Sequence, residues 1–266
     1  MGSSSTSFEV LGITKERALQ ALATYRFLTA EQMRRVGVSS DIGHTRQTLR
    51  ILSEMRPAQI YTIKFGVLSG HGRLAWLHAL TPSGVKTLQA YGLGEDVKAH
   101  KHTPMIKSDY HHRVACVDFH IALRKWASVD FFHADYDPTG DPLRKRTTIQ
   151  YPGGKIIPDA ILSMTDGATR LCAFEMYMDH RPERPVAQLR QYLPALTKRA
   201  IEGSYQYPHS VRVLAVFNDE AVIPRVARLA EKDPALMGAL PYFFLGTLES
   251  TRVGWSHFDG SSASLY

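Results

Sequence analysis

Two carboxylates stand out in the sequence because each lies in or beside an apolar segment. Asp159 lies in the segment 156–162, and Glu175 lies inside the segment 169–177. The turn sequence at 165–167, Thr-Asp-Gly, predicts a hairpin that places the two acids on neighbouring strands. Hard divalent cations prefer carboxylate oxygens, and such a centre can activate water and neutralise a phosphate. The plainer interpretation makes Asp159 a surface acid beside a turn, but a lone buried acid such as Glu175 is costly without a role.

The segments around these acids predict the elements that must position them. The range 211–217 is apolar throughout, which is typical of a buried parallel strand. The order along this part of the chain is helix, three strands, helix, strand, helix, strand. The helices are expected over 108–128, 185–199 and 223–232, and the remaining strands over 129–136, 211–217 and 242–247.

The first third of the chain has a different pattern. Helix signals occur at 14–27, at 29–36, where Thr29 and Gln32 have the spacing of a capping box, and at 40–55 after a cap cluster at 39–41. Two strands are expected at 59–65 and 73–80, joined by a turn-rich tip at 66–72. Thr81 and Pro82 then begin a closing helix. Three helices, a hairpin and a closing helix predict a winged helix-turn-helix.

The helix at 40–55 has side chains suited to a DNA groove. Arg, Gln, His and Thr side chains reach base edges and phosphates, whereas basic groups on the hairpin give affinity without sequence information. Residues 1–105 hold 13 Lys/Arg against 7 Asp/Glu, a net charge of +6, whereas residues 106–266 have a net charge of +1. The alternative is a solvated helix face or a protein-contacting winged helix. The predicted DNA-binding residues are His44, Thr45, Arg46, Gln47, Arg50, Lys64, His71 and Arg73.

Composition narrows the class of protein. The 266 residues are 44% hydrophobic and 21% charged, so the chain is globular and not disordered. No apolar run approaches the roughly 18 residues of a membrane span, so no membrane partner is expected. The start lacks a signal-peptide pattern, and the two cysteines, Cys116 and Cys172, cannot form a disulfide framework. We therefore expect a cytoplasmic protein with domains at 1–92 and 108–266 and a linker at 93–107.

The acidic motif and its element order resemble the PD-(D/E)XK, or restriction-endonuclease-like, nuclease fold. The match rests on Pro158-Asp159 on one hairpin strand and Glu175-Met176-Tyr177 on the next. The resemblance implies an α/β nuclease-like domain within an α+β chain. It implies that Asp159, Glu175 and the Met176 carbonyl hold Mg²⁺ or Mn²⁺. Gln188 and Tyr192, four residues apart, fit a Gln-x-x-x-Tyr element found in some members, and they share a helix face.

One position departs from that pattern, because Tyr177 stands where the family usually has Lys. A neutral phenol stabilises developing charge poorly. Three interpretations remain open: another basic residue compensates, the chemistry differs, with Tyr177 or Tyr192 forming a covalent link, or the domain binds without cutting. The candidate compensating residues are Lys155, Arg144, Arg146 and Arg190.

Taken together, the two halves resemble the replication-relaxation family, which includes the MOBC-type plasmid relaxases, from about residue 14 to 248. The resemblance implies recognition of an origin of transfer and metal-dependent nicking of one DNA strand to start mobilisation. By position it places His112, or His111, and Asp118 at the border of the catalytic site, whereas the plainer interpretation makes the two histidines helix-cap or surface residues. The implied partners are double-stranded DNA, single-stranded DNA, other mobilisation proteins and a second copy in a homodimer. The alternative is a non-enzymatic replication or transcription regulator with a degenerate nuclease fold; a protein-interaction adaptor is a third.

Overall fold

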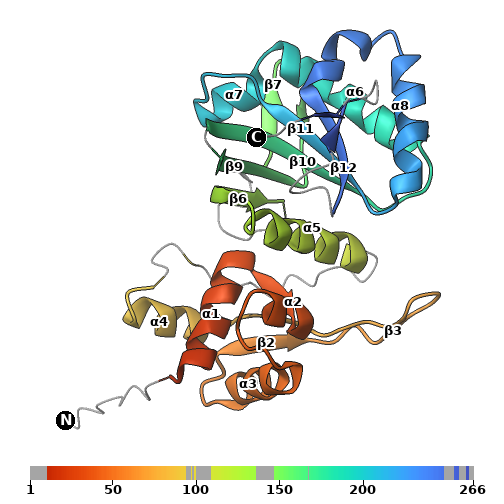
Figure 1. Ribbon diagram of the computed structural model, residues 1–266. Helices are drawn as coiled ribbons and strands as arrows, with labels where there is room; N and C mark the ends of the chain where they lie inside the picture. The colour runs from red at the N-terminus through yellow and green to blue at the C-terminus, as the bar shows by residue number, and fades with distance from the viewer. Residues whose placement is uncertain are drawn as a thin grey trace. The chain divides into compact units, whose positions relative to one another are not determined.

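The computed structural model describes residues 11–93, 97, 99, 109–135, 147–166, 168–248, 255–257 and 262–263. The chain divides into two compact units, one up to residue 107 and one from residue 108 onward. Both units combine helices with sheet, so the chain is α+β (Figure 1). Most of the predicted linker 93–107 lies outside the described residues.

Among its described residues, the first unit contains four helices and a three-stranded sheet of order β1-β5-β2. Both pairings in this sheet are antiparallel. The four helices and the pair of β2 with β5 correspond to the helices and the hairpin that the sequence predicts. Their bounds are α1 Ile13–Tyr25, β1 Phe27–Thr29, α2 Ala30–Arg35, α3 Ile42–Glu54, β2 Ile60–Ile63, β3 Val67–Leu68, β4 Gly72–Arg73, β5 Leu77–Leu80 and α4 Pro82–Ala90.

Local capping chemistry fixes three of these helix starts. Thr29 and Gln32 form the predicted capping box of α2, with the Gln32 amide donating to Thr29 Oγ1. Asp41 caps α3, and Thr81 caps α4 with Pro82 in its first turn. The first helix differs from the expectation, because α1 begins at Ile13 with Gly12 as its N-cap and no side-chain cap.

The predicted hairpin is divided into two ladders. The strands expected at 59–65 and 73–80 pair through β2 and β5, with Ile60 opposite Leu80. The tip forms a separate two-stranded ladder, β3 with β4. Gly66, Gly70 and Gly72 have positive φ in this segment, which glycine adopts at no steric cost. The segment 74–76 therefore separates β4 from β5, where one continuous strand was expected.

The second unit is built on a seven-stranded mixed sheet of order β14-β13-β12-β11-β10-β9-β6. The β9–β10 hairpin is antiparallel, with Asp166 opposite Ala168 as the turn sequence predicts. The β10–β11 and β11–β12 pairs are parallel. The strand bounds are β6 Ser128–Ala134, β9 Ala160–Asp166, β10 Ala168–Tyr177, β11 Arg212–Phe217, β12 Phe243–Thr247, β13 Trp255–Ser256 and β14 Ser262–Ala263.

Helices cover both faces of this sheet. On one face, α5 (Tyr110–Leu123) contributes Ala115, Cys116 and Phe119 to a core with Phe174 and Leu214. The other core contains Leu189 and Tyr192 of α6 (Glu183–Thr197) and Val226 of α8 (Ile223–Glu231), packed with Ala173 and Val213. In Figure 1, α5 lies on one side of the sheet, and α6 and α8 lie on the other.

Several short elements were not predicted. A two-stranded ladder, β7 (Ile149–Tyr151) with β8 (Gly154–Ile156), precedes β9. The helix α7 (Ala200–Tyr205) follows α6 after Arg199, whose φ is 49°. The 3-10 segments at Glu220–Val222 and Met237–Tyr242 and the strands β13 and β14 complete the described elements.

None of the described helices is long and apolar enough to cross a membrane.

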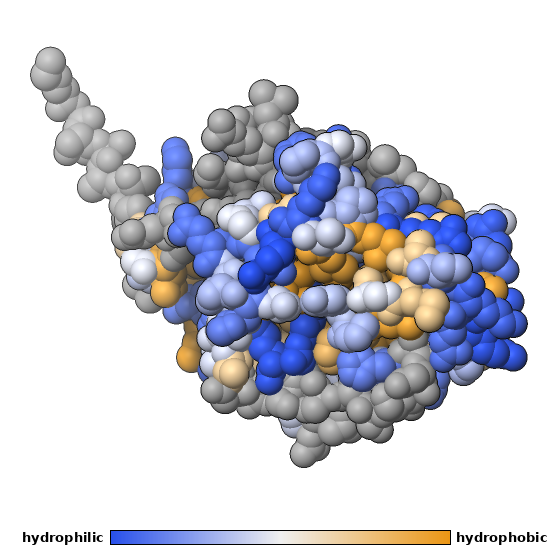
Figure 2. Space-filling model, turned by 90° about the horizontal axis from the view of Figure 1, so that it is seen from above, coloured by the Kyte–Doolittle hydropathy of each residue, from blue (hydrophilic) through white to orange (hydrophobic). Residues whose placement is uncertain are grey.

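Figure 2 shows one face of the molecule, on which hydrophobic residues are visible between broad hydrophilic areas. Exposed large apolar side chains such as Leu229 and Met237 are 37% and 63% exposed. Scattered exposure of this kind is ordinary for a globular surface.

Gly84 of α4 provides a test of how tightly the first unit is packed. A Cβ at this position would lie 2.1 Å from the Gln59 carbonyl oxygen, so either α4 or the start of β2 must move. We expect Gly84→Ala to lower the free energy of unfolding by about 1–3 kcal/mol, the usual cost of overpacking. Thermal unfolding followed by circular dichroism measures this. Gly203→Ala, whose Cβ meets nothing within 4 Å, is the control; equal melting temperatures for the two variants would contradict the packing argument.

Candidate functional site

Asp159 lies just before β9 and joins three elements of the second unit. Its Oδ2 is 3.0 Å from His112 Nε2 on α5 and accepts a hydrogen bond of 2.8 Å from the Met176 amide on β10. The Asp135 amide, directly after β6, donates to the Asp159 carbonyl at 2.9 Å. Both recorded side-chain contacts use Oδ2. The hairpin therefore brings Asp159 beside Met176, next to Glu175 in the sequence.

Glu175 lies in β10 and is only 3% exposed. Two side chains of α6 donate to its carboxylate: Gln188 Nε2 to Oε2 at 2.6 Å and the Tyr192 hydroxyl to Oε1 at 2.5 Å. The four-residue spacing of Gln188 and Tyr192 places both on the helix face that packs on the sheet. The structure therefore brings together Asp159, Glu175, Met176, Gln188, Tyr192 and His112 from the predicted site.

The electrostatics of this cluster disfavour an isolated negative charge on Glu175. Burial raises its pKa well above the ordinary value, and the nearby charges of Asp159 and Asp135 raise it further, whereas the Tyr192 hydrogen bond lowers it. Burial lowers the pKa of His112, but the hydrogen bond to Asp159 and the charges of Asp159 and Asp135 together outweigh this, so the net pKa is raised. Because the pKa values of both Glu175 and His112 are raised, the cluster favours binding of a proton or a cation.

Two residues near the acids were missed by sequence reasoning. Cys116 lies one helical turn after His112, and the ligand atoms of His112, Cys116 and Asp159 all lie within 4.8 Å of one another. Burial raises the pKa of the Cys116 thiol, with Asp159 and Asp135 adding to the effect. The spacing of His112 and Cys116 was a readable signal, but Cys116 resembles an ordinary apolar position. Asp135 had no local signal, because its place depends on the β6–β9 pairing.

Tyr177 occupies a buried position on the same side of β10 as Glu175. Its ring stacks on Phe217 with centroids 5.0 Å apart. Its hydroxyl is buried and has no hydrogen-bond partner among the described residues. Burial raises its pKa well above the ordinary value, and the charge of Glu175 adds to this, so the phenol stays neutral.

The basic residues considered as replacements for the missing Lys do not join the acids. Arg190 pairs with Asp233, and Lys155 is exposed in β8. Arg144 and Arg146 lie outside the described residues. Among the described residues, His112 is therefore the basic side chain in direct contact with one of the two acids.

The donor set of this cluster fits a divalent cation. The charge of Asp159 raises the pKa of the Glu175 carboxyl group, and both donors to Glu175 are uncharged groups. Each carboxylate oxygen has two lone pairs, so the hydrogen bonds leave acceptor capacity on both acids. A cation beside them would relieve the repulsion that otherwise favours protonation of Glu175.

The DNA-binding candidates of α3 lie on its exposed side, with one exception. His44, Arg46, Gln47 and Arg50 are exposed. Thr45 is fully buried and its hydroxyl donates to the Asp41 carbonyl, so its assignment to a DNA-contacting face is wrong. It faces the core with Thr48 and Leu49 because helical periodicity repeats every three to four residues.

The hairpin candidates are also exposed. Lys64, His71 and Arg73 lie on or beside the β3–β4 tip. The Lys64 ammonium lies 4.5 Å from the centroid of the Trp76 ring, an arrangement that orients the charge. On α3, Arg50 pairs with Glu54 at 3.0 Å, which leaves Arg46 as the α3 arginine without a recorded ion pair among the described residues.

A comparison with protein families gives one match. The model of a family described as Replication-relaxation matches residues 19–205. The match begins in α1 of the first unit and ends in α7 of the second, so it includes Asp159, Glu175, Gln188 and Tyr192. No curated protein and no solved structure matches the chain.

Tyr192 provides a test of how the buried acid is held. Tyr192→Phe removes the donor to Glu175 Oε1 and leaves a buried acceptor with one partner fewer. We expect the free energy of unfolding to fall by about 1–3 kcal/mol, the cost of an unsatisfied buried group. Urea denaturation measures it. Tyr242→Phe, at a position 36% exposed, removes the same atom and should cost much less; equal losses would show that the bond to Glu175 contributes nothing specific.

Proposed function

We propose that this chain, which belongs to the replication-relaxation family, is a DNA-nicking relaxase whose cutting site is the Asp159–Glu175 cluster. Membership of the family points to a role in replication or mobilisation. The observation that carries the proposal is that Asp159, just before β9, contacts both His112 and the Met176 amide, which is next to Glu175 in β10.

Asp159, Glu175 and the Met176 carbonyl would hold the Mg²⁺ or Mn²⁺ ion. The carbonyl is well placed, because the amide and carbonyl of a strand residue point to the same neighbour and the Met176 amide already faces Asp159. The bound ion supplies charge to the phosphate and lowers the pKa of a water molecule. Gln188 and Tyr192 hold the Glu175 carboxylate in one orientation.

His112 takes the part that a Lys has in related nuclease patterns. Its pKa is raised by contact with Asp159, so a proton is readily held on the ring. Its side chain is 34% exposed, so it can exchange that proton with solvent or with a departing oxygen. This arrangement accounts for a neutral Tyr177 at the usual Lys position.

We assign recognition of duplex DNA to the first unit. The exposed side of α3 supplies His44, Arg46, Gln47 and Arg50 to the major groove, and the β3–β4 tip supplies Lys64, His71 and Arg73 to the phosphates. The net charge of +6 over residues 1–105 suits this partner.

A second candidate function is a DNA-binding regulator that cuts nothing. The observation in its favour is Tyr177, a buried neutral ring stacked on Phe217 at the position of the missing Lys. In this case the two acids serve only to hold α5 and α6 on the sheet.

Nicking of supercoiled plasmid separates the two functions. Asp159→Asn and Glu175→Gln each remove a charge from the cluster, and we expect each to reduce the rate of Mn²⁺-dependent nicking by about 100-fold, or about 2.7 kcal/mol. The plasmid carries the cognate origin, and a chelator should abolish nicking by the unmodified chain.

Glu231→Gln, which removes an exposed charge at the end of α8, is the matched control and should nick normally. Nicking that survives in both site variants would exclude these acids as the cutting centre. Duplex binding without nicking in the unmodified chain would favour the regulator.

Arg46 tests the proposed DNA face. We expect Arg46→Ala to weaken binding of a duplex selected by the chain from a random library by about 1–3 kcal/mol, because one arginine contact to a base edge is lost. Fluorescence anisotropy at several salt concentrations measures the affinity. Lys86→Ala removes the same charge from the exposed side of α4 and should change the affinity little. Equal losses would mean that net charge, not the α3 face, binds the duplex.

A further inference from the structure

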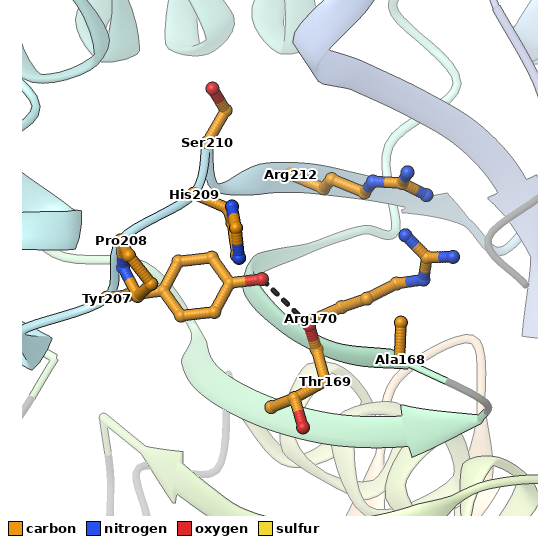
Figure 3. A pocket seen from close by; sticks show the side chains of 8 residues that line it. All are labelled: Ala168, Thr169, Arg170, Tyr207, Pro208, His209, Ser210 and Arg212. Carbon is orange, nitrogen blue, oxygen red and sulfur yellow. Dashed lines mark hydrogen bonds between the residues drawn. The ribbon is translucent and has the colours of Figure 1, made fainter.

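A second site of different character lies at the opposite end of β10 from Glu175. An open pocket of about 490 Å³ is lined by the start of β10, the segment between α7 and β11, and the first residue of β11 (Figure 3). This volume is within the roughly 300–1,000 Å³ of small-molecule sites. Arg170 and Glu175 are separated along β10 by about 17 Å at roughly 3.3 Å per residue, so one phosphate cannot contact both. The lining residues are Ala168, Thr169, Arg170, Tyr207, Pro208, His209, Ser210 and Arg212.

The pocket is basic, and its two arginines are held together by the sheet. Cys172 is the β10 partner of Arg212, and Arg170 lies two residues before Cys172, so both arginines emerge on the same face. Figure 3 shows the two guanidinium groups extending toward the same side of the pocket. The lining contains His209 as a third basic group and no acid. Like charges fixed this close repel one another unless an anion lies between them.

The surroundings of both arginines favour binding of a ligand that accepts hydrogen bonds. The Arg170 Nε is buried and has no hydrogen-bond partner among the described residues, which is costly for a charged donor. The guanidinium carbon of Arg212 lies 4.8 Å from the centroid of the Phe244 ring, which supports one face of the group. Burial lowers the pKa of Arg212, and the charge of Arg170 lowers it further.

The remaining wall is aromatic. The Tyr207 hydroxyl donates to the Thr169 carbonyl at 2.8 Å, which fixes the ring against the start of β10. The His209 ring meets it edge-on with centroids 5.7 Å apart. Half-exposed aromatic rings beside arginines are typical of sites that bind single-stranded nucleotides, in which the base stacks and the phosphate is paired.

We propose that this pocket binds a phosphate group, with Arg170 and Arg212 donating to its oxygens and Tyr207 placed beside the attached base. The phosphate belongs either to a single strand of DNA or to a free nucleotide. The inference goes beyond the proposed nicking activity, because the pocket binds phosphate whether or not the acids cut DNA. Arg170 lies within the family match, whereas Tyr207 and Arg212 lie beyond its end.

Nuclear magnetic resonance of the arginine Nε–H groups tests the pocket site by site in the full chain. A short 5′-phosphorylated single strand and, separately, deoxythymidine monophosphate are added to unmodified protein without divalent ions. We expect the Arg170 and Arg212 signals to shift with saturation, whereas Arg228, exposed on α8, stays unchanged. Arg170→Gln and Arg212→Gln should each weaken binding by roughly tenfold, as the loss of one charge-assisted hydrogen bond predicts.

The outcomes are distinct. Shifts with both probes, or with the single strand alone, support DNA as the source of the phosphate. Shifts with the mononucleotide alone support a nucleotide site. Unchanged Arg170 and Arg212 signals with both probes would overturn the proposal, as would unweakened binding in both variants. Because no cleavage is measured, loss of the nicking function leaves this result intact.

Discussion

The second unit is organised around a buried carboxylate. Glu175 lies in the middle of the sheet and is only 3% exposed. Because water cannot reach its carboxylate oxygens, protein groups must supply their hydrogen bonds. Gln188 and Tyr192 do so from one face of α6, which fixes that helix in position and rotation over β10. The apolar residues of the same face, Val186 and Leu189, then pack on the sheet as a consequence.

Asp159 holds α5 on the opposite face of the sheet, as Glu175 holds α6 on its own face. Through Oδ2 it joins α5 to β10, and through its backbone carbonyl it joins the end of β6 to the start of β9. Each helix layer is thus tied to the sheet by one acid, and Asp159 contacts the amide of Met176, the residue after Glu175. Burial and the charge of Asp159 both raise the pKa of Glu175, and groups with strongly shifted pKa values cluster at functional sites.

Local signals made much of this predictable. The Thr-Asp-Gly turn gave the β9–β10 hairpin, and cap residues gave the starts of α2, α3 and α4. The position of Asp135 escaped prediction because it depends on pairing between distant segments: Asp135 enters the site only because β6 lies beside β9. The prediction that Thr45 contacts DNA was wrong for another reason. Residue type suggested a DNA contact, whereas helical phase places it with Leu49 in the core.

The sheet also explains why charge of opposite sign is gathered at the two ends of β10. Arg170 and Glu175 belong to one extended strand, paired on both sides, whose length changes little with thermal motion. The backbone, and not flexible side chains, therefore sets the distance between the acids and a phosphate bound at the arginine end. A loop could not hold such a spacing, because loops move more than the strands they connect. Because Arg170 and Glu175 are five residues apart, their side chains point to opposite faces of the sheet, so β10 separates the two sites across the sheet as well as along the strand.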